Sequence, residues 1–411
     1  MRIGLIYDRV YPWLNGGGEK TLWEIALQLT NAGDDIHYFG TKFWDGPNTI
    51  VREGVTLHGV CRRSEFYKSD GNRTIIQPLL FAWGLLIELW RQRHTRFDLI
   101  NCTVFPYFSV LAVWSFRVIS GRRVPWMLTW LEVWGRRYWQ TYLKSRSRGA
   151  IGFFVEWLCA KSCRTHLVIS PLQAARLRHL LRVPANQIQV LPRGVDLRAL
   201  PTKIRKQRHR VLYAGRLVPY KNLQSVLIAW PGVLIKCPAS TLRIIGSGPT
   251  SKELQALILR LGIGHCVEIL PPLQSPQAIL EEIANADVFV QPSIREGQSV
   301  TVIEAMAVGT AVIASQHQES AVSDLIEHEQ NGILIHQWNE PRAWEDWLVR
   351  LLEDSDLRTK LILAGRKTAA EYDLTTKIIP RLAALHAKLA GRCPILDGDS
   401  GVTRSRAAVA V

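Results

Sequence analysis

Short apolar segments of strand length recur along the chain, and stretches with helical spacing of apolar residues separate them. In the first half we predict strands at residues 2–7, 35–39, 98–102, 124–130 and 166–170. In the second half we predict strands at residues 211–214, 241–245, 266–270, 288–290, 311–314 and 332–335. Strands that alternate with helices form parallel sheets with helices on their faces. The pattern therefore predicts an α/β protein with two parallel sheets.

A cationic, proline-containing segment separates the two halves. Residues 203–210 hold five Lys or Arg and show no apolar periodicity, which favours an extended linker over residues 192–210. The predicted domains are residues 1–191 and 211–372, followed by a helical segment at 373–390 and a disordered tail at 391–411. Residues 41–70 show no regular pattern apart from a Gly-Pro turn.

Composition restricts the class of protein and the kind of partner. A chain of 411 residues with 47% apolar and 21% charged residues is globular and large enough for two domains. The net charge of +16 and the pI near 9.8 favour an anionic partner: a phosphate ligand, a membrane surface or a nucleic acid. Seven scattered cysteines without a C-x-x-C pair indicate reduced thiols, neither a disulfide framework nor a zinc site.

The apolar runs are too short for a spanning helix, and the first strand follows Met1 directly. The longest runs, residues 78–90 and 104–116, fall short of the ~20 residues that cross a bilayer. The chain begins without room for a signal peptide before the strand at residue 2. We therefore expect a cytoplasmic protein that is soluble or peripheral to a membrane.

A basic segment rich in tryptophan lies in the first half. Residues 117–148 hold eight Lys or Arg, one acid and the tryptophans at positions 126, 130, 134 and 139. Such a segment could lie on an anionic bilayer, or it could stack on single-stranded nucleic acid. The third interpretation is an aromatic core beneath a solvated basic face, and for each tryptophan taken singly this one is favoured.

The candidate chemistry centres on residues 287–310. A short apolar strand ends at Pro292, a turn contains Gly297, and a helix follows as far as residue 309. The start of a helix after such a turn offers backbone N–H groups and a positive dipole end, which suit a phosphate. Glu296 and Glu304, with seven residues between them, could hold a sugar and a ribose. The alternatives are a solvated loop acid at 296 and a capping box between Thr301 and Glu304.

Cations and glycines follow other predicted strands. Arg216 and Lys221 come directly after the strand at 211–214, so they lie at the same sheet edge as Glu296. Two fixed cations there would stabilise the negative charge that grows on a departing diphosphate. A run of glycines at 16–18 follows the first strand and could approach a phosphate. It lacks the G-x-G-x-x-G spacing of a dinucleotide site, and a flexible turn explains it equally well.

Taken together and in this order, the motifs resemble family 4 of the glycosyltransferases (glycosyltransferase group 1), a retaining family with the GT-B fold. The resemblance implies two Rossmann-like domains that face each other across a cleft. It assigns acceptor binding to residues 1–191, donor binding to residues 211–372, and packing against the first domain to the helix at 373–390. It also implies a nucleotide-sugar co-substrate, with no metal and no further cofactor.

The resemblance assigns roles residue by residue. Glu296 holds hydroxyls of the transferred sugar, Arg216 and Lys221 bind the diphosphate, and these three are the catalytic candidates. The remaining donor-binding candidates are Gly17, Gly18, Gly215, Gly246, Gly248, Gly297, Gln298, Ser299 and Glu304. In the family, the amides at 298 and 299 meet phosphate and Glu304 holds the ribose.

The chain departs from the family pattern at three places. Residues 129–135 read T-W-L-E-V-W-G, with Leu131 where the family has a histidine near the reacting carbon. The family has asparagine where Arg193 stands, and glycine or an aromatic residue where Gln298 and Ser299 stand. Leucine cannot take a proton, but in a retaining front-face transfer the leaving phosphate can accept the proton of the acceptor. Glu132 would point elsewhere from an extended segment.

The sequence therefore predicts a retaining glycosyltransferase that moves a sugar from a nucleotide-sugar to a lipid-linked or polysaccharide acceptor, in the cytoplasm or at the inner face of a membrane. Two alternatives stay open: a donor-binding protein without transfer activity, because of Leu131, and a basic nucleic-acid binder. The motifs do not specify the sugar, the nucleotide, the acceptor or the oligomeric state.

Overall fold

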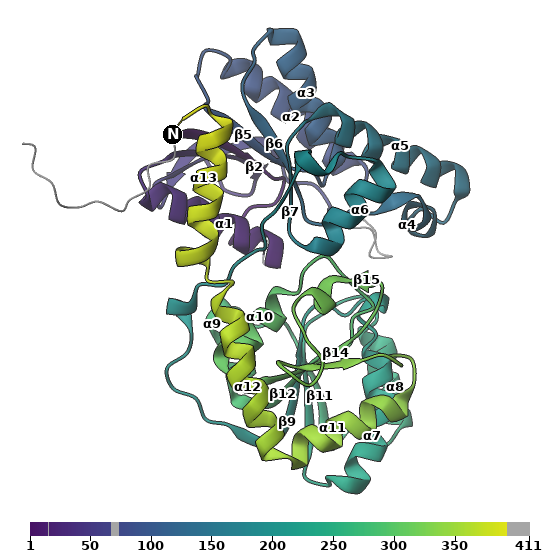
Figure 1. Cartoon of the computed structure of the whole chain (residues 1–411). Coiled ribbons are helices and arrows are strands. Elements are labelled where there is room, and N and C mark those ends of the chain that lie inside the picture. The colour runs from purple at the N-terminus through teal and green to yellow at the C-terminus, as the bar shows by residue number, and fades with distance from the viewer. Residues whose placement is uncertain (15, 67–73, 393–411) are drawn as a thin grey trace, which may run out of the picture.

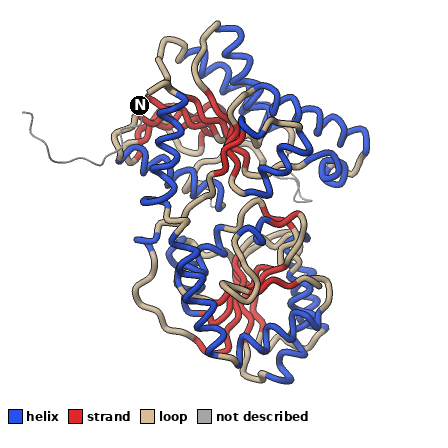
Figure 2. Tube along the Cα trace, in the orientation of Figure 1, coloured by secondary structure: helices blue, strands red, loops and turns tan. Residues whose placement is uncertain are grey.

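The computed structural model describes residues 1–14, 16–66 and 74–392. The two predicted α/β domains are confirmed, each with a predominantly parallel sheet between helices (Figures 1 and 2). The tail that we expected to be disordered lies outside the described residues from position 393 onward.

The first domain is built on an eight-stranded sheet with the order β3-β4-β2-β1-β5-β6-β7-β8. All neighbouring strands run parallel except β3 and β4. The strands are β1 (Arg2–Ile6), β2 (Asp35–Lys42), β3 (Thr49–Arg52), β4 (Val55–Arg62), β5 (Leu99–Thr103), β6 (Trp126–Trp130), β7 (His166–Val168) and β8 (Ile188–Val190).

Helices cover both faces of this sheet. The set comprises α1 (Gly17–Asn31), α2 (Ile76–Arg91), α3 (Tyr107–Ser120), α4 (Gly135–Tyr142), α5 (Arg146–Ser162) and α6 (Pro171–Leu181). One apolar core joins the sheet to α2, α3 and α5, and a second core joins the opposite face to α1 and to the C-terminal helix α13 (Ile379–Leu389). The outer surfaces of α2, α3 and α5 therefore belong to the same side of the domain.

Our interpretation of residues 41–70 as irregular was wrong for residues 41–42, 49–52 and 55–62, and residues 67–70 lie outside the described residues. The segment contains the end of β2 and the antiparallel pair β3 and β4, joined at Glu53 and Gly54. Both turn residues have positive φ, 51° and 82°, as a tight hairpin turn requires. The apolar residues of β3 are half-buried or exposed, so this edge strand lacks the apolar run by which we recognised the central strands.

The second domain has a six-stranded parallel sheet with the order β11-β10-β9-β12-β14-β16, and a separate parallel pair, β13 and β15. Its strands are β9 (Gln207–Ala214), β10 (Thr241–Ile245), β11 (Val267–Leu270), β12 (Ala286–Gln291), β13 (Arg295–Glu296), β14 (Ala311–Ser315), β15 (Glu319–Ser320) and β16 (Ile333–Ile335). Its helices are α7 (Leu223–Lys236), α8 (Ser251–Arg260), α9 (Pro276–Asn285), α10 (Val300–Val308), α11 (Pro341–Glu353) and α12 (Ser355–Ala370).

The linker is shorter than predicted, because β9 begins at Gln207, inside residues 192–210. The polar start of this central strand is satisfied by its neighbour in the sheet. Lys206 Nζ donates to the Ala286 carbonyl at 2.6 Å, and the His209 amide donates to Asp287 Oδ2 at 2.7 Å. Local composition resembled a solvated segment, but long-range partners make it part of the sheet.

After α12 the chain returns to the first domain. A π-helical turn, Leu374–Ile378, leads into α13, and Val195 of the linker pairs with Asp373 beside it. Leu374, Ile378 and Leu382 are buried in the core that contains α1. The two connections between the domains thus run side by side.

Three of the four tryptophans in the basic segment are buried, which contradicts the bilayer and nucleic-acid interpretations for these side chains. Trp126, Trp130 and Trp139 lie in the core of the first domain, and the indole N–H of Trp139 donates to Glu156 at 2.9 Å. Trp134 packs against Trp139, with ring centroids 4.7 Å apart. The cations between them remain on the surface, so the third interpretation holds.

Across the ranges given above, none of the helices is both long and apolar enough to cross a membrane.

We predict an acid-sensitive contribution from His386 on α13. The side chain is fully buried, and among the described residues neither ring nitrogen has a hydrogen-bond partner. Burial lowers the pKa of His386 to about 4, so between about pH 6.5 and pH 4 the unfolded chain binds a proton that the folded protein does not. Stability therefore falls as the pH drops through this window.

Urea unfolding at pH 7 and pH 5 measures this loss. The free energy of unfolding should fall between pH 7 and pH 5, and His386→Leu should make this fall smaller by about 2 kcal/mol. His179→Leu, at an exposed position on α6, should leave the difference unchanged. An unaltered pH dependence in the His386 variant would contradict the assignment.

Candidate functional site

The two sheets meet at the edges where their strands end. In the first sheet β1 lies between β2 and β5, and in the second β9 lies between β10 and β12. In open α/β sheets, ligands bind outside the carboxyl ends of the strands at such a reversal of strand order. Lys20, which follows β1, contacts Glu304, which follows β12. The two reversal points therefore face the same interface between the domains.

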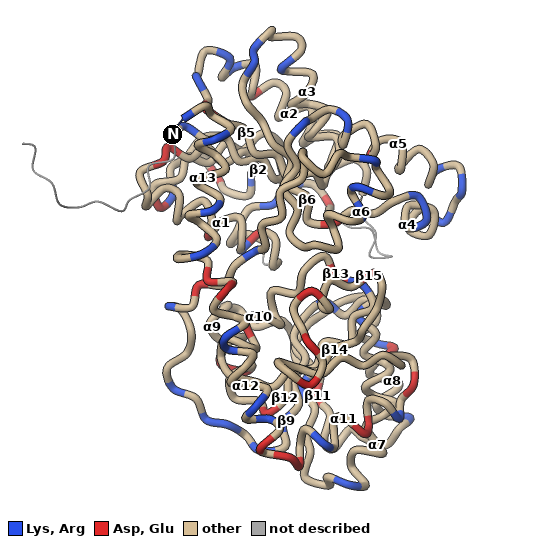
Figure 3. The backbone as a smooth tube through the Cα atoms, viewed as in Figure 1, with Lys and Arg blue, Asp and Glu red and all other residues tan. Residues whose placement is uncertain are grey.

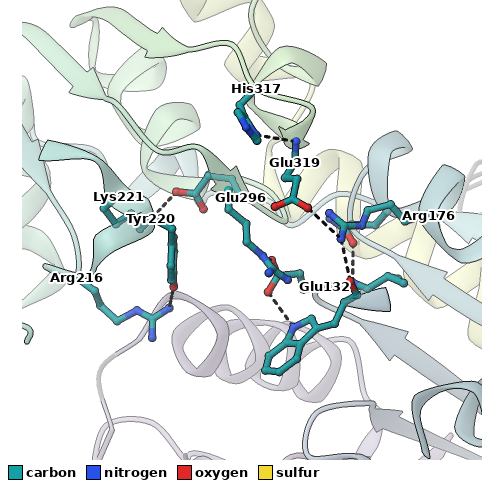
Figure 4. Close-up of polar contacts among 12 residues, drawn as sticks. Glu132, Arg176, Arg216, Tyr220, Lys221, Glu296, His317 and Glu319 are labelled. Carbon is teal, nitrogen blue, oxygen red and sulfur yellow. Dashed lines mark hydrogen bonds and ion pairs between the residues drawn. The ribbon is translucent and has the colours of Figure 1, made fainter. Parts of the chain in front are cut away.

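Glu296 occupies the short strand β13 at this interface. Its carboxylate accepts a hydrogen bond from Lys221 (Figure 4). It also accepts one from the side-chain amide of Gln291. Lys221 and Glu296 are each only 13% exposed, so the pair is largely removed from water. The Ile294 amide donates to the Tyr220 carbonyl at 3.0 Å, which joins the two loops directly. The structure thus brings Lys221 to Glu296, as their positions after neighbouring strands predicted.

Arg216 lies on the same loop as Lys221 and is more exposed. Its guanidinium donates to the Tyr220 hydroxyl at 2.5 Å. It is therefore held near the site while keeping further N–H groups that could meet a phosphate.

Glu304 faces the first domain from the second turn of α10. Lys20 Nζ lies 3.3 Å from its carboxylate, across the domain interface. Burial raises the pKa of Glu304, and the charge of Lys20 opposes that rise. The capping-box alternative is excluded, because α10 begins at Val300 with Ser299 as its N-cap, which places Thr301 inside the helix.

Two glycines let the loops of the second domain approach one another. A Cβ on Gly246 would lie 1.9 Å from the Gly215 carbonyl oxygen, and one on Gly248 would lie 2.1 Å from the Leu217 carbonyl oxygen. No side chain fits at such distances. These glycines therefore press the loop that carries Arg216 against the end of β10.

Leu131 lies between the glycines of the first domain and the turn of the second. A Cβ added to Gly18 would lie 3.4 Å from the Leu131 side chain. A Cβ added to Gly297 would lie 2.3 Å from the Leu131 carbonyl oxygen. Gly17 and Gly18 open α1, and a Cβ on Gly17 would lie 3.8 Å from an Arg193 nitrogen. The position at which the chain lacks a histidine is thus in the middle of the site.

Arg193 and Gln298 form a tight pair that we did not predict. The Arg193 amide donates to Gln298 Oε1 at 2.8 Å, Gln298 Nε2 donates to the Arg193 carbonyl at 3.1 Å, and the Arg193 guanidinium donates to the Gln298 carbonyl at 2.9 Å. Burial lowers the pKa of Arg193, and the charge of Glu296 opposes this. Gln298 therefore binds the linker through its side chain, and Arg193 adds a cation to the site. The sequence offered one signal for this pair, because Arg193 stands where the family has an asparagine.

Glu132 also has a role that sequence reasoning missed. It lies next to Leu131, and its carboxylate accepts from Arg295 Nε at 2.5 Å and from Trp134 Nε1 at 3.1 Å. Arg295 is the neighbour of Glu296, so this ion pair joins the first domain to the turn that carries the candidate acid. Side-chain length lets Glu132 reach a residue 163 positions away, which no local pattern reveals.

The arrangement combines two carboxylates with cations from both domains. Glu296 and Glu304 can accept hydrogen bonds from hydroxyl groups, while Arg216, Lys221 and the start of α10 can bind anionic oxygens. Ser299 is the N-cap residue of α10, and its side chain makes no capping hydrogen bond. In the part of the chain that the structure describes, no group of three or more His, Cys, Asp or Glu could hold a metal ion.

Family models match both halves of the chain. The model described as "Glycosyltransferase Family 4" matches residues 15–199, and the model described as "Glycosyl transferases group 1" matches residues 200–368. Together they include every candidate site residue named above.

Relatives and solved structures agree with these matches. A protein of Escherichia coli (strain K12) named as a colanic acid biosynthesis glycosyltransferase, WcaL, is 30% identical over 230 residues, which cover 53% of this chain and 55% of WcaL. The chain thus spans about half the length of that curated relative.

Two solved structures share the fold over nearly the whole chain. Sucrose-phosphate synthase from Thermosynechococcus elongatus has a TM-score of 0.77 at 20% identity and covers 95% of this chain and 99% of its own. Anabaena HepE, solved in complex with UDP and glucose, has a TM-score of 0.70 at 17% identity and covers 94% of this chain and 100% of its own.

We predict that Gly246→Ala separates the two loops that carry the site. The new methyl group would overlap the Gly215 carbonyl, so the variant should lose about 2 kcal/mol of stability in urea unfolding. Gly264→Ala is the matched control, because the nearest atom to its Cβ is 3.9 Å away. The control should stay within about 0.5 kcal/mol of the unmodified protein, and equal effects of both substitutions would refute the close approach.

Proposed function

The chain belongs to the glycosyltransferase group 1 family, family 4 of the glycosyltransferases, with the GT-B fold, and we propose that it transfers a sugar from a nucleotide-sugar to an acceptor with retention of configuration. The observation that carries the proposal is the meeting of Glu296, Glu304, Arg216 and Lys221 at one domain interface.

Donor binding follows from the chemistry of these groups. Glu296 would accept hydrogen bonds from hydroxyls of the sugar, and Glu304 would accept them from the ribose. Arg216, Lys221 and the amides of Gln298 and Ser299 would bind the diphosphate between them. The lysines now paired with the two acids would be released to the ligand's anionic and hydroxyl oxygens. That HepE was solved with UDP and glucose supports a nucleotide-sugar of this kind.

The transfer itself needs little acid–base chemistry from the protein. The bond between C1 of the sugar and the phosphate oxygen breaks, and its electron pair stays on the phosphate. The acceptor oxygen bonds to C1 from the same face, and its proton passes to the leaving phosphate oxygen. Arg216 and Lys221 stabilise the growing negative charge. We propose no metal and no cofactor for this step.

Leu131 keeps a second candidate function open. It lies between Gly18 and Gly297, where the family resemblance places a histidine, and it can neither move a proton nor hydrogen-bond a hydroxyl. A protein that binds the donor without transferring the sugar is therefore the alternative to the enzyme.

For the acceptor, we propose a lipid-linked sugar or a growing polysaccharide, used at the inner face of a membrane in the cytoplasm. The name of WcaL, which refers to colanic acid biosynthesis, supports a polysaccharide pathway. The net charge of +16 supports a location next to anionic lipid.

A panel of nucleotide-sugars tests the donor assignment. One donor should raise the melting temperature and be hydrolysed slowly to the nucleoside diphosphate. Glu296→Ala should reduce this hydrolysis by about 100-fold, which is typical for the loss of a group that contacts the reacting sugar. Glu281→Ala, at an exposed position on α9, should behave like the unmodified protein. No response to any donor would overturn the proposed function.

Leu131→His separates the enzyme from the inactive binder. If the leaving phosphate accepts the proton, the unmodified protein turns over with an acceptor and the variant changes only the rate. If turnover is undetectable until histidine is introduced, the chain is a donor-binding protein and the transferase proposal fails. An assay of nucleoside diphosphate release, by quench-flow or by discontinuous sampling, distinguishes the two results. Donor binding is measured in parallel.

A further inference from the structure

One side of the first domain exposes an unusually apolar surface, which we call the outer helical face. On α2, six residues that are 37–67% exposed form a stripe at helical spacing: Ile76, Leu79, Leu80, Trp83, Ile87 and Trp90. The opposite side of the same helix is buried through Phe81, Leu85 and Leu89. α2 is therefore apolar on both sides, although only one of them packs against the sheet.

Neighbouring helices extend this face. α3 packs against α2 and α5, and all three belong to the same core of the first domain. Their outward side chains include further exposed apolar residues: Trp114, Val118 and Ile119 on α3, and Ile151, Phe154 and Trp157 on α5. Phe154 and Trp157 stack with ring centroids 6.0 Å apart. Large apolar patches of this kind on a folded domain mark an interaction site.

The charges around the face indicate what covers it. The chain from residue 75 to 164 holds 13 Lys or Arg: Arg91, Arg93, Arg96, Arg117, Arg122, Arg123, Arg136, Arg137, Lys144, Arg146, Arg148, Lys161 and Arg164. The same range holds four acids: Glu88, Asp98, Glu132 and Glu156. In Figure 3, basic positions mark the upper loops beside α2 and α3 and the outer ends of α4 and α5.

All four acids are engaged by other groups. Glu88 accepts from Gln92, lies beside His58 and pairs with Arg91, which is one of the 13 cations. Asp98 pairs with Arg392, and Glu132 pairs with Arg295. Glu156 is fully buried and accepts hydrogen bonds from Tyr107, Trp134, Gly135 and Trp139. The surface around the apolar face is thus strongly cationic.

We propose that the outer helical face docks on an anionic lipid bilayer, with its apolar side chains in the interface and the surrounding Lys and Arg on the headgroups. An apolar surface with tryptophans and a cationic rim is the chemistry that such an interface binds. A second copy of this chain would carry the same positive charge and be repelled. This face replaces the buried tryptophans at 126, 130 and 139 as the membrane contact.

The position of the face suits the proposed function. The access route for the acceptor rests on that function, whereas the docking itself does not. β4 and β5 run parallel to β1, so the chain leaves both at the edge where the domains meet. α3 begins four residues after β5, and α2 is the helix that follows β4. Both helices therefore start near the candidate site and run away from it. A lipid-linked acceptor in the bilayer would reach the site along this side.

Vesicle flotation tests the docking directly. The full-length protein should float with vesicles of phosphatidylcholine containing about 30% phosphatidylglycerol and much less with phosphatidylcholine alone. The triple variant Ile76→Ser, Leu80→Ser, Trp83→Ser should bind at least about tenfold more weakly. The matched control is Ile235→Ser, Leu259→Ser, Leu363→Ser, which removes apolar residues that are 57–81% exposed on the second domain. It should float like the unmodified protein.

Further variants separate this proposal from its rivals. Arg122→Glu with Arg123→Glu should weaken binding to the anionic vesicles, because both flank the exposed end of α3. Glu296→Ala should float normally, so loss of catalysis and loss of docking are distinguishable. Failure to bind anionic vesicles at low salt, or equal flotation of the α2 variant and the control, would overturn the proposal. The proposal would also fail if light scattering showed that the unmodified protein and the control variant are dimers and the α2 variant is a monomer.

Discussion

The approach of the Leu131 carbonyl to Gly297 sets how closely the two domains face each other. A Cβ at position 297 would lie 2.3 Å from that oxygen, so only glycine permits the contact. Around it, the Glu132–Arg295 ion pair holds the turn of the second domain against the first domain, and the Arg193–Gln298 hydrogen bonds hold the same turn against the linker. The positions of Glu296 and of the start of α10 depend on this set of contacts, because both belong to the same turn.

Within that frame, the acids of the site are already neutralised by lysines. Lys221 is paired with Glu296 inside one domain, and Lys20 is paired with Glu304 across the interface. Breaking a partly buried pair by removing one partner leaves an uncompensated charge, which is costly. A ligand that carries both hydroxyls and phosphates can replace both partners at once: hydroxyls for the acids and anionic oxygens for the lysines. This combination of hydroxyls and phosphates is the chemistry of the proposed nucleotide-sugar donor.

The first domain divides its apolar residues between two tasks. The tryptophans at 126, 130 and 139 are buried in its core, where Trp139 finds a hydrogen-bond partner in Glu156. The outer helical face keeps aromatic and aliphatic side chains exposed to solvent, in a region where Lys and Arg outnumber Asp and Glu. Composition alone detects the basic and aromatic character of this region, but burial decides which of the aromatic residues can meet a partner.

The sequence by itself determined the strands that bury an apolar run, the two-domain division, and the clustering of Glu296, Arg216 and Lys221, because strand ends in a parallel sheet share one edge. It did not reveal the β3–β4 hairpin, whose edge strand has no buried run, or the true start of β9, whose polar residues are satisfied by Ala286 and Asp287. Arg193, Gln298, Glu132 and Arg295 acquired their partners only in the folded chain. Periodicity shows which positions are buried, because apolar side chains are excluded from water. Contacts between side chains more than 100 residues apart depend on how whole domains pack.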